Sequence, residues 1–266
     1  MPLEPQSEPT WLTPDWPVPP GVRALSTWRV GGVSAGHYAS LNLGDHVGDA
    51  PQAVAENRRR LRVAASLPAE PRWLRQVHGI AVADLDRPNA EPDRPMLAAQ
   101  ERPGQDAAFA RGPGKICAIL TADCLPILLA ARNGSAVAAV HAGWRGLAAG
   151  VIAATLGSLG LPAGDLIAWL GPCIGAERYE VGDEVRAAVL AQAPEAAAAF
   201  TENSSGRFLA DLPRIARIQL GGLGLAAVYG ANACTLSDRD RYFSHRRDAP
   251  TGRQATLIWR TGCEDG

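Results

Sequence analysis

Three residues of the sequence have side chains that bind metals or act as nucleophiles, and each lies in a turn containing glycine or aspartate. His78 lies in RQVHG, Cys124 in TADC and His141 in HAGWRG. Two imidazole nitrogens and one thiolate fill three of zinc's four tetrahedral positions and leave the fourth open, which is typical of a catalytic zinc site. Zinc lowers the pKa of its bound water from about 15.7 to about 7 and so supplies hydroxide near neutral pH. The sequence therefore predicts a metal site at His78, Cys124 and His141, with Cys124 and His141 also catalytic.

The same residues suit a second chemistry. Cys124 could act as a nucleophile with His141 as its base and a neighbouring amide as oxyanion donor, giving a thiol amidase that acts on a cell-wall precursor or a protein glutamine. Asp123, next to Cys124, could move a proton or orient a ligand in either case. Zinc on Cys124 would block its use as a nucleophile, so the two hypotheses exclude each other and both remain open.

Two arginines and an asparagine are candidates for binding substrate. Arg145 lies in HAGWRG, directly before a predicted helix whose N-terminus favours an anion. Arg58 lies in ENRRRL on the basic face of another predicted helix, and Asn42 lies in a loop rich in Gly, Ser and Asn. A guanidinium group binds phosphate or carboxylate through paired hydrogen bonds. We therefore predict that Arg58 and Arg145 bind an anionic group and that Asn42 belongs to the pocket.

The other cysteines have weaker cases. Cys173 in GPCIG lies in a turn and could be a thiol behind the metal ligands, whereas Cys117 lies in an apolar run typical of the core. Cys234 is undecided, and Cys263 near the end of the chain is expected to be exposed. Without a secretory signal, five cysteines favour free thiols or metal ligands over a disulfide framework.

Short apolar runs predict the elements that position these residues. Strands of one large sheet are expected in the runs PRWLRQV, IAVADLD, QDAAFA, KICAILTA, CLPILLAA and SAVAAVHA. Further strands are expected at 22–29, 165–170 and 254–260, and helices at 52–67, 147–160, 181–193 and 211–224. Asp49 before Pro51 is predicted to cap the first helix. The three metal-binding candidates lie at strand ends, so parallel neighbouring strands would bring them together.

The order of these elements indicates a mixed α/β (α+β) fold with a central mixed sheet and flanking helices. Strands run consecutively in the middle and helices follow, without regular βαβ alternation and without a G-x-G-x-x-G dinucleotide motif. We expect a Pro-rich N-terminal arm at 1–21 and a single catalytic domain at 22–266.

Composition narrows the possible partners. The chain of 266 residues has 26 basic and 27 acidic residues, so its charge pattern indicates neither a nucleic-acid nor a membrane partner. No apolar run approaches the roughly 18 residues that span a bilayer. The N-terminal segment lacks the pattern of a signal peptide. We therefore expect a soluble cytoplasmic protein, with a monomer as the default.

Several motifs taken together resemble the bacterial YfiH-like family of polyphenol oxidase or laccase-domain proteins, over residues 22–260. They are GGVS, SLNLG, ENR, QVHG, TADCLPILL, HAGWRGLAAGV, GPCIG, YEVG, FSHRRD and TGRQATLIW. The resemblance implies a single-domain fold similar to the catalytic domain of cytotoxic necrotizing factor, with zinc on His78, Cys124 and His141. It also implies phosphorolysis of adenosine, inosine and methylthioadenosine together with adenosine deamination. A peptidoglycan-editing amidase is a further description of this family.

The laccase description can be tested by counting residues. A multicopper oxidase needs an imidazole-rich cluster in addition to its blue-copper site, yet the chain has five histidines. The methionines are Met1 and Met96, so an axial thioether is hard to supply. A copper-dependent polyphenol oxidase is therefore the weaker alternative, although copper itself could occupy a site of two histidines and one cysteine.

Overall fold

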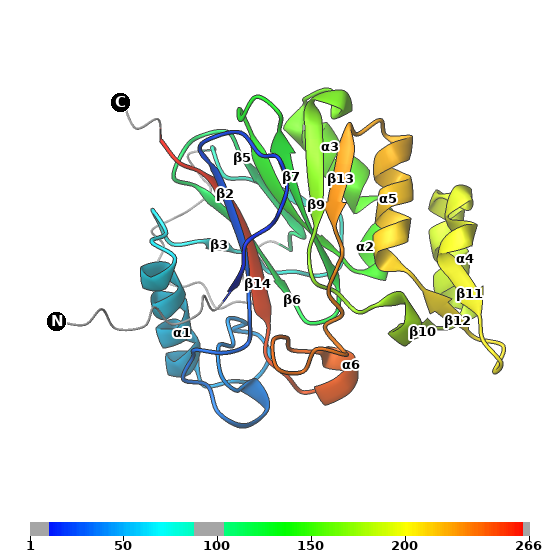
Figure 1. Ribbon diagram of the computed structural model, residues 1–266, viewed down its shortest axis with the longest axis horizontal. Coiled ribbons are helices and arrows are strands. Elements are labelled where there is room, and N and C mark those ends of the chain that lie inside the picture. Colours follow the sequence, from blue (N-terminus) through cyan, green and yellow to red (C-terminus); the bar gives the residue numbers. More distant parts are fainter. Residues whose placement is uncertain (1–10, 88–103, 263–266) are drawn as a thin grey trace.

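Two β-sheets lie face to face and are covered by helices on their outer sides in the computed structural model, which describes residues 11–87 and 104–262 (Figure 1). The first sheet has five strands in the order β1 (Trp11–Leu12), β2 (Val22–Thr27), β14 (Gln254–Arg260), β6 (Ile116–Thr121) and β3 (Arg72–Trp73). Its neighbours are antiparallel except for β3 and β6, which run parallel.

The second sheet has six strands and carries most of the candidate site. Its order is β13 (Ala227–Gly230), β9 (Leu166–Leu170), β7 (Leu125–Ala131), β8 (Val137–Ala142), β5 (Ala107–Ala110) and β4 (Val82–Asp84). The central pairs are antiparallel, whereas β13 runs parallel to β9 and β4 runs parallel to β5.

Helices and a small third sheet complete the described part of the chain. The α-helices are α1 (Pro51–Ala64), α2 (Trp144–Ala149), α3 (Val151–Leu159), α4 (Asp183–Gln192), α5 (Leu212–Gly222) and α6 (His245–Asp248). The short 3-10 helices are η1 (Gly36–Tyr38), η3 (Ala163–Asp165), η4 (Ala176–Arg178) and η5 (Pro194–Ala199). The third sheet is β10 (Glu180–Val181), β12 (Phe208–Ala210) and β11 (Phe200–Glu202).

The central strands are apolar along their whole length because both of their faces are buried. In β7, Ile127 and Leu129 face the helices, whereas Leu128 and Ala130 face the other sheet. All seven residues of this strand are buried. Full burial of a side chain of this size stabilises the folded protein by about 1.5–3 kcal/mol. The packed sheets therefore hold the residues at their edge in fixed positions.

The structure confirms the mixed α/β fold and corrects parts of the expectation. The middle strands belong to two sheets rather than one, because β6 pairs with β14 from the end of the chain and β3 pairs with β6. The helix expected at 147–160 is interrupted at Gly150, where a φ of 88° separates α2 from α3. Sequence reasoning also missed the third sheet and β13, which are formed by short segments.

Asp49 does not cap α1, contrary to the prediction. Ala50 is the N-cap and makes no side-chain hydrogen bond. The Oδ2 atom of Asp49 instead accepts hydrogen bonds from Ser34 Oγ at 2.6 Å and Asn42 Nδ2 at 2.8 Å. This carboxylate therefore fixes the loop before α1.

Part of the predicted N-terminal arm packs on the domain. The backbone of Trp11 and Leu12 pairs with β2, and Trp16 is buried between the two sheets. Residues 1–10 lie outside the described part of the chain. No helix within the described ranges is long and apolar enough to cross a membrane.

Candidate functional site

Antiparallel pairing of β7 and β8 brings Cys124 and His141 together. Pro126 of β7 lies opposite His141 of β8 in the register, and Cys124 directly precedes β7. The predicted convergence is confirmed, and its expected cause is right in part. His78 and Cys124 follow β3 and β6, which run parallel, whereas the antiparallel pairing of β7 and β8 brings Cys124 and His141 together.

His78 reaches the same place from the other sheet. It lies in the loop after β3 with a positive φ of 60°, which directs its ring toward the end of β8. The ring centroids of His78 and His141 are 4.8 Å apart. His78 Nε2 lies 3.8 Å from Cys124 Sγ, and the possible ligand atoms of the three residues lie within 4.8 Å of one another. We call these three residues the ligand cluster.

The ligand cluster fits a tetrahedral metal. Zinc bonds of about 2.3 Å to sulfur and about 2.0 Å to nitrogen place neighbouring donors roughly 3.5 Å apart, compared with 3.8 Å between His78 Nε2 and Cys124 Sγ and at most 4.8 Å within the cluster. Gly143 permits this approach because a Cβ at that position would lie 3.0 Å from both Cys124 Sγ and His78 Cδ2. The softness of one thiolate and two imidazoles suits zinc or copper.

Asp106 supports both histidines, and sequence reasoning missed it. Its fully buried carboxylate lies 2.8 Å from His141 Nδ1 through Oδ1. It also accepts hydrogen bonds from the amides of Val77, His78 and Gly79 at 2.7–3.2 Å. The signal in the sequence was a single acid at the head of the apolar run QDAAFA. Because the carboxylate accepts from Nδ1, Nε2 of His141 is the nitrogen left for a metal.

The electrostatics of the cluster favour the ionised thiol. Burial opposes ionisation of Cys124, but the charge and hydrogen bonds of His141 and His78 outweigh it and lower the pKa of Cys124 to about 6. Burial likewise opposes the charge on His141, but Cys124 and Asp106 raise the pKa of His141 to about 9. The protein therefore presents a thiolate, which is the form that binds metal or attacks carbon.

Asp123 has a buried carboxylate that is already occupied by hydrogen bonds. Thr235 Oγ1 donates to Oδ1 at 2.6 Å, and Ser244 Oγ and the Arg246 amide donate to Oδ2 at 3.0 and 2.7 Å. Its backbone has a φ of 89°, which places it in a tight turn. These contacts join the turn before Cys124 to two distant loops, a geometry of positioning rather than proton transfer.

Asn42 and Arg58 are also engaged within the protein. The amide group of Asn42 is fully buried and bonds to Gly44, Asp49 and the Arg253 backbone. Arg58 donates twice to the carbonyl of Leu43 and stacks over Trp73 at 4.4 Å. Both therefore shape the loop around 42–45, and the described contacts leave them little capacity to bind substrate directly.

Arg145 and Arg246 are held by aromatic rings near the ligand cluster. The Arg145 guanidinium lies 4.4 Å from the centroid of Trp144, and Arg246 lies 5.3 Å from that of Tyr179. Both arginines are exposed. Sequence reasoning identified Arg145 but treated FSHRRD only as a motif, so it missed Arg246.

Arg253 is a further cation that the sequence did not reveal. Burial lowers the pKa of its guanidinium, and the charges of Cys124 and Asp123 offset part of that effect. Its side-chain hydrogen bonds go to the carbonyls of Thr251 and Gly252. It packs against Gly44, where a Cβ would meet its Cγ at 2.9 Å.

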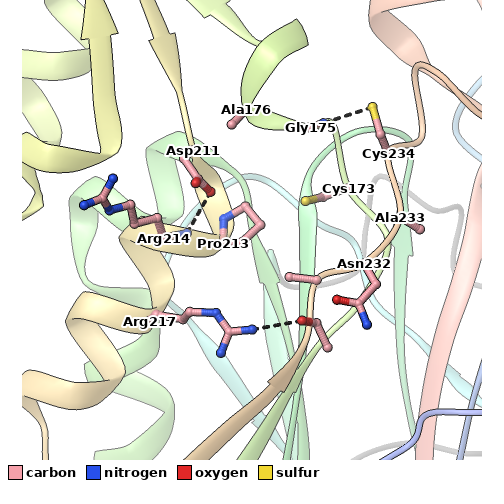
Figure 2. A pocket seen from close by; sticks show the side chains of 12 residues that line it. Cys173, Gly175, Ala176, Asp211, Pro213, Arg214, Arg217, Asn232, Ala233 and Cys234 are labelled. Carbon is pink, nitrogen blue, oxygen red and sulfur yellow. Dashed lines mark hydrogen bonds between the residues drawn. The ribbon is translucent and has the colours of Figure 1, made fainter.

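A separate cavity of about 570 Å³ lies between α5 and the loop after β13 (Figure 2). Cys173 and Cys234 line it, and neither belongs to the ligand cluster. The Gly175 amide donates to Cys234 Sγ at 3.2 Å. Cys173 is therefore not placed as a metal ligand.

The remaining histidines do not build a second metal centre. His37, His46 and His245 are exposed and lie in η1, the following loop and α6. Within the described ranges, the ligand cluster is the group of three donors close enough to hold a metal ion. The imidazole-rich cluster of a multicopper oxidase is absent from that part of the chain.

Comparisons with known proteins identify the family of the chain and agree with this fold. The family model described as multi-copper polyphenol oxidoreductase laccase matches residues 23–261. The chain is 52% identical to purine nucleoside phosphorylase PA4543 of Pseudomonas aeruginosa over 94% of this chain and 98% of that protein. It is 46% identical to purine nucleoside phosphorylase YfiH of Escherichia coli over 93% and 98% of the two chains.

Solved structures show the same architecture. The Neisseria meningitidis protein NMB0706 superposes with a TM-score of 0.88 at 45% identity, covering 96% of this chain and all of that one. YlmD from Geobacillus stearothermophilus gives a TM-score of 0.86 at 33% identity, with 97% and 98% of the two chains covered. The chain therefore belongs to the YfiH-like family of laccase-domain proteins.

Proposed function

We propose that this protein is a zinc-dependent purine nucleoside phosphorylase that acts on adenosine, inosine and methylthioadenosine. The observation that carries the proposal is the ligand cluster, with donors within 4.8 Å, in a chain 52% identical to a relative named as such an enzyme. The names of the relatives do not specify a metal. Zinc is supported by the donor set and by the open fourth position expected of a site with three protein ligands.

Phosphorolysis exchanges one bond for another at the sugar carbon. The C1′–N bond to the base breaks, a bond from C1′ to a phosphate oxygen forms, and the proton of HPO₄²⁻ goes to the departing base. The products are the free purine and the sugar 1-phosphate. The protein must therefore hold an uncharged nucleoside and a dianion together and stabilise charge that moves toward the base.

Particular residues suit each part of this task. His78, Cys124 and His141 would hold zinc, and a bound zinc supplies Lewis acidity at its open position. Arg145 is the candidate for phosphate, since its guanidinium is exposed beside the cluster. Asn42, Arg58 and Asp123 would support the walls of the pocket through their internal hydrogen bonds.

Adenosine deamination is the second activity that we propose for the same centre. It replaces the amino group at C6 with an oxygen from water and releases ammonia, so it needs no phosphate. Because the carboxylate of Asp123 already accepts three hydrogen bonds, we propose that another group transfers the proton to the leaving amine.

The function can be tested with purified protein whose metal content has been measured. Each nucleoside is incubated with and without phosphate, and the products are separated by chromatography. We expect free base and sugar 1-phosphate only with phosphate, loss of turnover on chelation, and recovery with zinc rather than copper. Turnover that persists in fully chelated protein would exclude the zinc mechanism.

A thiol amidase is the second candidate because Cys124, His141 and Asp106 also form the series of nucleophile, base and orienting carboxylate. This enzyme would work without metal and would be inactivated by a thiol alkylator in the chelated state. The same chelation experiment, followed by an assay on peptidoglycan-type amides, therefore separates the two candidates.

A further inference from the structure

We propose that Arg145 and Arg246 form a two-armed clamp that binds the phosphate consumed in phosphorolysis. This inference rests on the proposed function. It adds Arg246 to Arg145 as a second cation for phosphate, and it assigns Trp144 and Tyr179 as the aromatic rings that position the two arginines. The opposing possibility is that both arginines are ordinary solvated surface charges, but aromatic rings hold both of them.

The two guanidinium groups are held by one packed surface. Trp144 and Tyr179 both pack against the small core cluster of Val181, Val185 and Ala210. Arg145 stacks on the first ring at 4.4 Å and Arg246 on the second at 5.3 Å. Stacking on an aromatic ring fixes an arginine without using its N–H donors.

Neither charge is neutralised within the described residues. Arg145 has no hydrogen bond or ion pair there, and Arg246 uses one nitrogen, Nη1, to donate to the carbonyl of Glu180 at 3.0 Å. Other exposed arginines of this protein do have a carboxylate partner, since Arg59 and Arg60 both form ion pairs with Glu56. Two fixed cations without carboxylate partners suit an anionic ligand.

Both arginines are tied to the ligand cluster through the backbone. Gly143, which would meet Cys124 and His78 if it carried a Cβ, lies two residues before Arg145. The amide of Arg246 donates to Asp123 Oδ2 at 2.7 Å, and Asp123 directly precedes Cys124. Both side chains therefore leave the backbone close to residues that position the ligand cluster.

Tyr179 lies within reach of all these charges. Burial and the charge of Cys124 raise its pKa to about 12, against the lowering effect of Arg246 and Arg145. The ring hydroxyl therefore remains a hydrogen-bond donor at neutral pH. A donor hydroxyl near two guanidinium groups is suited to an oxygen-rich anion.

Charge selects phosphate rather than nucleoside as the ligand of this clamp. HPO₄²⁻ carries two negative charges and can accept paired hydrogen bonds from each guanidinium, whereas the purine nucleosides are neutral. Holding the dianion beside the cluster would place a phosphate oxygen for attack at C1′.

The test compares Arg145→Gln and Arg246→Gln with a matched control. Arg111→Gln removes the same charge from an arginine that stacks on Phe109 at 4.7 Å. Arg111 follows the last residue of β5, at the opposite end of that strand from Asp106. Each zinc-loaded protein is titrated with inorganic phosphate by calorimetry, and KM is measured separately for phosphate and inosine.

We expect each clamp variant to bind phosphate roughly 10- to 100-fold more weakly, the usual effect of losing a charged hydrogen-bond partner. KM for phosphate should rise in parallel, while KM for inosine stays within about twofold and Arg111→Gln behaves as wild type. Arg246→Lys keeps the charge but loses the paired N–H donors of the guanidinium group. Its phosphate affinity should lie between those of the wild type and Arg246→Gln.

The outcomes separate this inference from the proposed function. If wild-type protein shows no phosphorolysis, the proposed function fails, but calorimetry still decides whether the clamp binds phosphate. Unchanged phosphate affinity in both glutamine variants would overturn the clamp. A rise confined to KM for inosine would overturn it as well, because the arginines would then bind nucleoside.

Discussion

The carboxylate of Asp106 lies 2.8 Å from Nδ1 of His141, and the same buried group accepts the amide of His78 at 2.9 Å. One side chain therefore orients an imidazole on β8 and holds the loop that carries the other imidazole. Because these histidines come from different sheets, Asp106 links the two halves of the sandwich at the ligand cluster.

Replacing Asp106 with asparagine should weaken metal binding more than any other change outside the ligand cluster. The side-chain amide introduced by Asp106→Asn would turn an N–H group toward donors that now meet a carboxylate, so at least one buried donor loses its acceptor. We expect about 10- to 100-fold weaker zinc affinity and a loss of about 1–3 kcal/mol in unfolding free energy. Zinc competition with a chromophoric chelator and urea denaturation measure the two effects. Wild-type zinc affinity in this variant would show that Asp106 does not position His141.

The ligand cluster itself can be tested by measuring retained metal. Cys124→Ala should lose both zinc and turnover, because two imidazoles alone hold zinc weakly. Cys173→Ala is the control, since that thiol lines the separate cavity and should leave most of the zinc in place. Metal analysis after gel filtration gives the result. Full zinc occupancy in Cys124→Ala would mean that the ligand set is wrong.

Local patterns in the sequence were sufficient for most of the longer strands and helices and for the grouping of the three residues of the ligand cluster. The apolar run at β7 predicted a strand, which the structure shows to be fully buried, and the turns around His78, Cys124 and His141 predicted reactive groups at strand ends. The division into two sheets could not be predicted, because it depends on the pairing of β14 with both β2 and β6. Such pairings join segments that lie far apart in the chain.

The roles of polar residues were harder to predict than their presence. Asn42 and Arg58 have side chains suited to substrate, yet the fold uses their hydrogen bonds internally. In the sequence, Asp106 is an ordinary acidic residue before a predicted strand. Its role depends on contacts with the loop of His78, which only the structure shows. Whether a polar side chain is free or occupied depends on distant backbone groups, which a local pattern does not contain.

Asp123→Asn distinguishes positioning from proton transfer. The side-chain oxygen of the new asparagine can accept from Ser244 and the Arg246 amide, while its NH₂ group can donate to the hydroxyl of Thr235. We therefore expect a folded, zinc-loaded protein that keeps at least about a tenth of its turnover, consistent with a cost of about 1.4 kcal/mol or less. If Asp123 were an essential proton carrier, the variant's turnover would instead fall by several orders of magnitude. The limb of the pH–rate profile that reports Asp123 would also disappear. Initial rates of phosphorolysis and deamination between pH 5 and 9 would reveal that loss.

The thiols outside the ligand cluster should differ in their pH dependence of alkylation. Burial opposes ionisation of Cys234, but hydrogen bonds from Ser237 and the Gly175 amide outweigh it and hold its pKa below the ordinary value. Burial raises the pKa of Cys117 and Cys173 well above that value. Since the thiolate is the reactive form, a lowered pKa shifts half-maximal labelling to lower pH and a raised pKa shifts it to higher pH.

In zinc-loaded protein we therefore expect Cys234 to be labelled before Cys117 and Cys173 near neutral pH, with these two unlabelled until the protein unfolds. Iodoacetamide labelling from pH 6 to 10, followed by peptide mass spectrometry, gives the profile of each thiol. Urea-unfolded protein is the control, because there the three profiles should coincide. Labelling of Cys173 before Cys234 in the folded protein would contradict the placement of the Gly175 amide against Cys234 Sγ, which is one of the contacts that lower its pKa.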